Sequence, residues 1–121
     1  MSVPRWATVA AVTVVALASL GCNDQRKQEC ERFLGAMKPL EKGTPTAELV
    51  DAVSKQVEGL HLQDATLAIY AKNYQATLLV LSNALELKAG SSPPDGTDAV
   101  IQQNLKAART DADDAQRYCA P

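Results

Sequence analysis

The chain has 121 residues and a formal net charge of −2 at pH 7, which limits it to about one domain of ordinary size. Its 12 basic side chains are outnumbered by 14 acidic ones, so there is no basic excess with which to bind nucleic-acid phosphates. Aromatic residues make up only 4% of the chain, which argues against a base-stacking surface, and no nucleic-acid partner is expected.

The first predicted element is an apolar segment, "WATVAAVTVVALASL", which covers residues 6–20 without a charged side chain. The terminal amine and Arg5 precede it, and the charged sequence "NDQRKQE" follows shortly after it. A membrane-spanning helix needs roughly 20 apolar residues. This shorter segment is therefore typical of the hydrophobic region of a secretory signal peptide.

The end of this segment, "ASLGC", places the small residue Gly21 directly before Cys22. It resembles the lipobox of bacterial lipoproteins, with Ser19 where leucine is usual three residues before the cysteine. The resemblance implies that residues 1–21 are removed as a signal peptide and that Cys22 becomes an acylated first residue, which anchors the protein to a membrane. Asn23, rather than aspartate, at the next position implies the periplasmic side of the outer membrane rather than the inner membrane. The alternatives are an ordinary signal peptide with an incidental cysteine and an uncleaved anchor.

The number of cysteines agrees with that interpretation, because the chain has three. If Cys22 carries lipid, Cys30 and Cys119 remain as an even pair, which suits an oxidising compartment. The sequence contains no CxxC, no CxxCH and no Cys/His cluster. No zinc site, haem attachment or thiol redox motif is therefore expected.

Residues 22–121 are expected to form a single domain, and its first helix is predicted over residues 24–41. Apolar side chains recur there at spacings of three and four residues, which places them on one face of a helix. They are Cys30, Phe33, Met37 and Leu40. The sequence "KGTPT" then interrupts the pattern. Gly43 is expected to cap this helix, Thr44 to cap the next one, and Pro45 to be the first residue of that next helix.

Three further helices are predicted, over residues 45–58, 64–89 and 97–119. The first of these carries a valine stripe and is expected to end at Gly59, while Asp64 is expected to cap the start of the following helix. The last two repeat their apolar residues in a seven-residue pattern and are separated by the loop sequence "GSSPPDGT". Three of the repeated residues in the last helix are alanine, so this helix is expected to approach its neighbours closely.

Amphipathic helices joined by short loops predict antiparallel neighbours. The expected fold is therefore all-α, a small up-down-up-down bundle of four helices. In that topology Cys30 is near the start of the first helix and Cys119 is at the end of the fourth. Both therefore lie at the same end of the bundle, each on its helix's apolar face. A disulfide between Cys30 and Cys119 is predicted, with two buried free thiols as the alternative.

Few residues are candidates for chemistry. His61, the single histidine, lies near Asp64, but helix capping explains that aspartate better than a catalytic pair does. Met37 and His61 would lie too far apart in the bundle to bind one haem. The cluster Asp111–Asp114 lacks the glycine and glutamate of a calcium loop and is expected to be a solvated helix face. No catalytic, cofactor-binding or metal-binding residue is assigned, and no enzymatic activity is expected.

These features indicate a lipid-anchored, non-enzymatic helical envelope lipoprotein that acts in protein binding or scaffolding at a membrane surface, with an envelope protein as its partner. The alternative is a periplasmic binding module that holds a small apolar ligand or cofactor in the bundle core, in space left by the alanines of the last helix. The tyrosines Tyr70, Tyr74 and Tyr118 are expected in the core or at its boundary, and an exposed one would indicate a partner surface.

Overall fold

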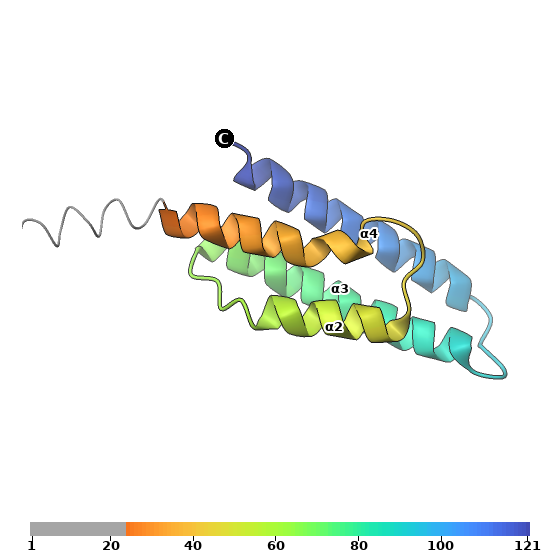
Figure 1. Cartoon of the computed structure of the whole chain (residues 1–121). Coiled ribbons are helices and arrows are strands. Elements are labelled where there is room, and N and C mark those ends of the chain that lie inside the picture. Colours follow the sequence, from red (N-terminus) through yellow and green to blue (C-terminus); the bar gives the residue numbers. More distant parts are fainter. Residues whose placement is uncertain (1–23) are drawn as a thin grey trace, which may run out of the picture.

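The computed structural model describes residues 24–121, so Cys22 and the lipobox-like sequence lie outside the described residues. The elements are a first helix that is α-helical from residue 24 to residue 37, η1 (Lys38–Leu40), α2 (Ala47–Glu58), α3 (Ala65–Ala89) and α4 (Thr97–Cys119). The four long helices run alternately up and down beside one another (Figure 1). No strand occurs within residues 24–121. The prediction of an all-α four-helix bundle is confirmed.

The end of the first helix differs from the prediction of a helix to residue 41. Its α-helical part ends at residue 37, and the 3-10 turn η1 takes the place of the last α-helical turn. Pro39 explains the change, because it has no N–H group to donate to the carbonyl four residues earlier. The prediction that Gly43 caps this helix is wrong, because Glu41 is the cap and its N–H donates to the Lys38 carbonyl. Gly43 instead turns the chain two residues later with a φ of 75°, a left-handed conformation that favours glycine.

The start of α2 is also shifted from the predicted position. Thr46, not Thr44, caps the helix, and its hydroxyl accepts a hydrogen bond of 3.2 Å from the Leu49 N–H. Pro45 is consequently buried ahead of the cap instead of opening the helix. The other predicted boundaries are confirmed, since Gly59 caps the end of α2 and Asp64 caps the start of α3.

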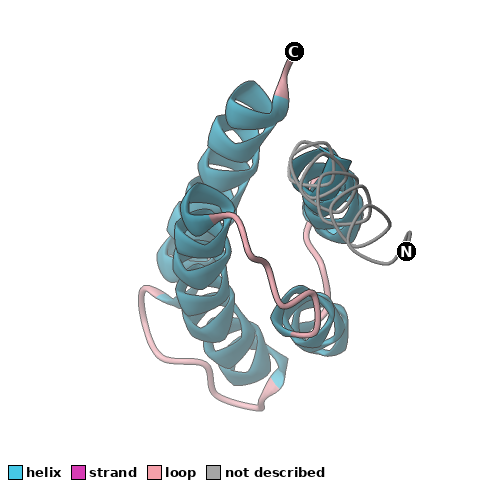
Figure 2. Cartoon of the chain, turned by 90° about the vertical axis from the view of Figure 1, so that its left-hand side faces the viewer, coloured by secondary structure: helices cyan, strands magenta, loops and turns pink. Residues whose placement is uncertain are grey.

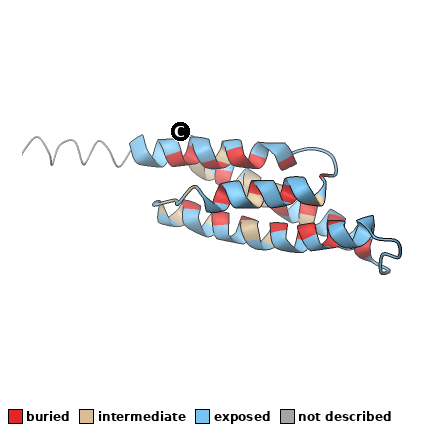
Figure 3. Ribbon diagram, turned by 60° about the horizontal axis from the view of Figure 1, so that its bottom comes forward, coloured by how far each residue is buried: buried red, intermediate tan, exposed pale blue. Residues whose placement is uncertain are grey.

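The core is built from the predicted apolar stripes, which face inward from every helix (Figure 3). Phe33, Leu67 and Leu78 are completely buried. Tyr74 is buried too, with its ring edge-on to Phe33 and 6.2 Å between ring centres. Helix α3 packs against both α2 and α4. The small side chains of α4 allow close packing, since Ala108 and Ala115 are buried against the other helices.

A disulfide joins the first helix to the last. Cys30 and Cys119 are bonded, with 5.7 Å between their Cα atoms and a sequence separation of 89. The end view in Figure 2 shows the C-terminus at the same end of the bundle as the start of the first helix. In the chain-entropy treatment a loop of this length stabilises the folded state by up to about 4–5 kcal/mol. That is a large share of the roughly 5–15 kcal/mol that stabilises a domain of this size.

We expect reduction of the Cys30–Cys119 bond to lower the free energy of unfolding by about 2–5 kcal/mol, because the reduced unfolded chain gains conformational freedom. Urea denaturation followed by circular dichroism, with and without a thiol reductant, measures the change. The variant with both Cys30→Ala and Cys119→Ala is the control, and the reductant should leave its midpoint unmoved. An unmoved midpoint in the parent protein would contradict a stabilising role for the bond.

Candidate functional site

A buried carboxylate holds the disulfide end of the bundle together. Glu29 is only 1% exposed, and its Oε1 accepts hydrogen bonds from the backbone N–H groups of Gln63 (2.7 Å) and Asp64 (3.0 Å). These N–H groups belong to the loop between α2 and α3, just ahead of the first residue of α3. A buried carboxylate is tolerated where hydrogen bonds replace the lost water. The first helix therefore fixes the point at which α3 begins.

Asp64 connects this loop to α4. Its carboxylate accepts a hydrogen bond from the Leu67 N–H (3.0 Å) and is within 3.0 and 3.1 Å of the Tyr118 hydroxyl, which donates to it. The Leu67 hydrogen bond is the largest cause of a lowered pKa at Asp64. The Tyr118 hydrogen bond and the charge of Arg26 lower this pKa further, while partial burial opposes them.

Tyr118 lies at the centre of the same cluster. The Arg26 guanidinium lies 4.4 Å from the centre of the Tyr118 ring and also donates to the Tyr118 carbonyl at 3.2 Å. The Tyr70 ring packs edge-on against Tyr118, with 6.0 Å between ring centres. The polar groups of this cluster satisfy one another beside the disulfide, so their arrangement stabilises the fold. Tyr70 and Tyr118 lie at the core boundary, as predicted.

The structure does not bring the other candidate residues together. Met37 is buried in the first helix, whereas His61 is exposed in the loop between α2 and α3 with a φ of 48°. Asp114 forms an ion pair of 3.1 Å with Arg117. Desolvation, with the neighbouring Asp114 charge, raises the pKa of Asp111. Within residues 24–121 no group of three potential metal-ligating side chains is found.

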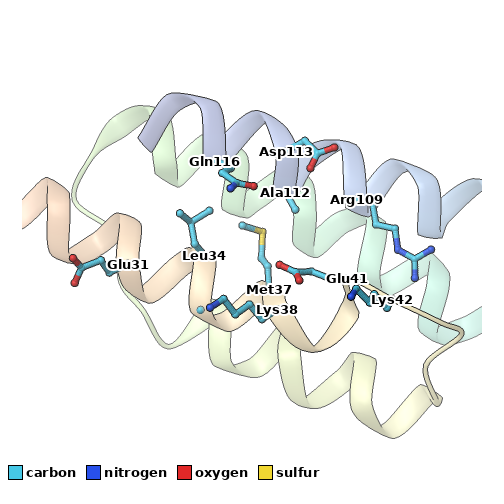
Figure 4. Close-up of a pocket in the computed structure, with 11 residues that line it drawn as sticks. Glu31, Leu34, Met37, Lys38, Glu41, Lys42, Arg109, Ala112, Asp113 and Gln116 are labelled. Atoms are coloured by element: carbon cyan, nitrogen blue, oxygen red, sulfur yellow. The ribbon is translucent and has the colours of Figure 1, made fainter. Parts of the chain in front are cut away.

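An open groove between the first helix and α4 is the principal candidate for a binding site (Figure 4). Its volume is about 890 Å³. The floor is apolar, and Figure 4 shows Leu34 and Met37 of the first helix facing Ala112 of α4. Gly35 widens the groove, since a Cβ atom placed on it would meet nothing within 4 Å. Gly35 and Ala112 are the small residues of the lining, and they leave the space between the larger side chains open.

Charged side chains of both signs surround this floor. The acidic and basic residues of the rim are Glu31, Glu41, Asp113, Lys38, Lys42 and Arg109. Neither of the two ion pairs found in residues 24–121 uses a rim residue. Arg109 donates instead to the carbonyls of Leu40 (3.3 Å) and Gly43 (2.6 Å), which fixes the end of the groove farther from the disulfide.

The groove combines an apolar centre with a charged rim and is open to solvent. An apolar centre within a polar rim is the usual anatomy of protein interfaces, whereas small apolar ligands are mostly enclosed by their pockets. The alanines of α4 divide accordingly. Ala108 and Ala115 are buried in the packed core, and Ala112 faces the open groove. Of these three alanines, only Ala112 contributes to the groove.

A scan against protein-family models and searches of curated proteins and of solved structures each find no match to this chain. None of the helices within residues 24–121 combines the length and the apolar character required to cross a membrane.

We expect ionised Asp64 to make folding stability depend on pH in the acidic range. Because its pKa is lower in the folded state than in the unfolded state, its contribution is fully present above the unfolded value of about 3.9 and is lost as pH falls through the folded value. Asp64→Asn is the matched variant, since asparagine also caps helices but does not titrate.

Urea denaturation at a series of pH values tests this expectation. The free energy of unfolding of the parent protein should fall more steeply than that of Asp64→Asn as the pH is lowered from about 5 to about 2. Parallel curves for the two proteins would show that Asp64 has the same pKa in both states.

Proposed function

We propose that the protein is a lipid-anchored, non-enzymatic lipoprotein of the bacterial envelope that binds a partner protein through the groove between the first helix and α4. The observation that carries the proposal is the apolar floor of this groove within a rim of both charge signs. The proposed anchor is Cys22, on the sequence grounds given above, and the proposed place is the periplasmic side of the outer membrane.

The position of the disulfide supports an anchoring role for Cys22. Residues 24–37 form one helix that contains Cys30, so only a short stretch of chain separates the proposed lipid from the cross-link to α4. A load applied at residue 22 would reach the first and last helices together through this bond. The disulfide would benefit a small domain that is tethered at one point, because force on the first helix could not separate that helix from α4 while the bond is intact.

The groove suits an amphipathic helical segment of the partner. The lining residues 31–38 extend about 11 Å along the first helix and the start of η1, which is about two helical turns, and Glu41 and Lys42 extend the lining beyond η1. A helix in such a groove places apolar residues at one-turn intervals against the floor and pairs its polar edges with the rim. The rim here offers both acidic and basic groups, so the expected partner segment carries both charge signs along its edges.

Lipidation is tested by metabolic labelling with radioactive palmitate in a bacterial host that processes lipoproteins. The parent chain should incorporate label and Cys22→Ala should not, because the cysteine sulfur carries the acyl group. Cys119→Ala, which removes another cysteine, is the control and should remain labelled. Equal labelling of Cys22→Ala would contradict the proposed lipidation of Cys22.

Partner binding is tested by crosslinking in intact membranes followed by affinity capture of the protein. Gly35→Leu should lower recovery of the partner about tenfold or more, because the added side chain fills the open floor. Gly35→Ala is the matched control. Both substitutions replace glycine within a helix and are expected to stabilise the fold by about 0.5–1 kcal/mol, but alanine adds only one methyl group.

The paired variants separate the groove from effects on stability. Partner recovery should remain near the parental level with Gly35→Ala. Equal recovery with both variants would place the partner elsewhere on the protein, and an equal loss with both would point to the helix rather than to the groove.

A further inference from the structure

The outward face of α3 is apolar, unlike those of α2 and α4. Its large exposed apolar side chains are Ile69, Leu79, Val80 and Leu87, which are 46–65% exposed. No charged residue occurs between residues 73 and 85 of this helix. The exposed faces of α2 and α4, in contrast, carry charges such as Glu48, Lys55, Asp98 and Lys106. Helix α3 thus has one apolar face in the core and a second one in solvent.

The exposed apolar residues follow a helical repeat. Residues at steps of four and three along the outward face are Ile69, Asn73, Ala76, Val80, Asn83 and Leu87, all of them exposed. Such a seven-residue repeat lets one helix pack lengthwise against another. We name these six residues, together with Lys72, Leu79 and Glu86 along one edge, the α3 stripe.

The α3 stripe is complementary to itself when two copies run in opposite directions. Pairing Ile69 with Leu87 of a second copy places Ala76 opposite Val80, a small residue against a larger one. The same register places Asn73 opposite Asn83, whose amides can donate and accept hydrogen bonds reciprocally. Every apolar position of the stripe then faces an apolar one, and every amide faces an amide.

The charges at the edge of the stripe favour the same arrangement. Lys72 and Glu86 are exposed, and neither takes part in an ion pair found within residues 24–121. In the antiparallel register Lys72 of each copy lies within about 3 Å, along the helix axis, of Glu86 of the other. In a parallel two-fold dimer the edges that carry Lys72 and Glu86 would lie on opposite sides of the contact, so the two residues could not pair. The charge pattern therefore selects a second copy of this chain in antiparallel orientation.

We propose that the protein forms a symmetric dimer through antiparallel packing of α3 against α3 of a second copy, with Leu79 of both copies in contact near the two-fold axis. The surface is distinct from the groove, because α3 lies between α2 and α4 whereas the groove lies between the first helix and α4. Two copies anchored in one membrane would lie with their helices along its surface, because their residue 24 ends point in opposite directions.

Cysteine crosslinking of the full chain in intact cell membranes tests the dimer. Leu79→Cys, treated with a short bismaleimide, should give a product of twice the mass of the chain. Gln102→Cys, at an exposed position of α4, is the control and should give none. The absence of a Leu79→Cys product, or a product with the mass of a different protein, would overturn the proposal.

The orientation has its own test. Differently tagged copies bearing Lys72→Cys and Glu86→Cys should crosslink to each other when made together, and neither should crosslink to itself when made alone. Self-crosslinking of Lys72→Cys would show parallel packing and would overturn the antiparallel dimer.

The two ion pairs are tested in the Leu79→Cys background. Lys72→Glu should lower the crosslinked yield about fivefold to tenfold, because it turns two exposed attractions into two repulsions. Addition of Glu86→Lys should restore the yield, since the swap recreates both pairs. Failure of the swap to restore it would contradict the proposed contact.

Discussion

The Cys30–Cys119 bond joins the first helix to the end of α4. The residues beside the two cysteines form hydrogen bonds that depend on this placement of the two helices. Glu29 precedes the first of these cysteines and holds the loop ahead of α3, while Tyr118 precedes the second and donates to the cap of α3. Four helices thus meet at one end through a covalent bond and a few buried or half-buried polar groups. Toward the opposite end no covalent bond joins the helices within the described residues, and the Arg109 hydrogen bonds, the Lys88–Asp98 ion pair and the Ser82–Asp51 hydrogen bond connect them instead.

The groove follows from this unequal arrangement. The disulfide fixes the separation of the first helix and α4 at one end, and the Arg109 hydrogen bonds fix it at the other. Between these two ties Gly35 and Ala112 supply too little side chain to close the space. A surface of this kind needs no mobile parts, because both of its walls are held at both ends. The α3 stripe lies on a helix whose other face is buried in the core.

The candidate site was only partly predictable from the sequence. Spacing identified the buried face of the first helix, but Glu29 stands one helical turn before Phe33 on that face, and nothing in its neighbourhood along the chain named the loop N–H groups it binds. Its position among buried apolar residues was the available signal. The groove was unpredictable for a related reason. Its lining combines residues from two helices that are far apart in sequence, and periodicity predicts the face of a helix but not which residues lie opposite that face.

The sequence by itself determined the helices, their core faces and the pairing of the two cysteines, because these follow from local periodicity and from the up-and-down order that short loops impose. It misplaced the turn at "KGTPT", where several residues can cap a helix and the choice depended on burying Pro45. The tertiary structure decided the partners of Glu29 and Tyr118, the open groove and the exposure of the second apolar face of α3. Each of these depends on which residues meet across helices, and that is fixed by packing rather than by any one segment.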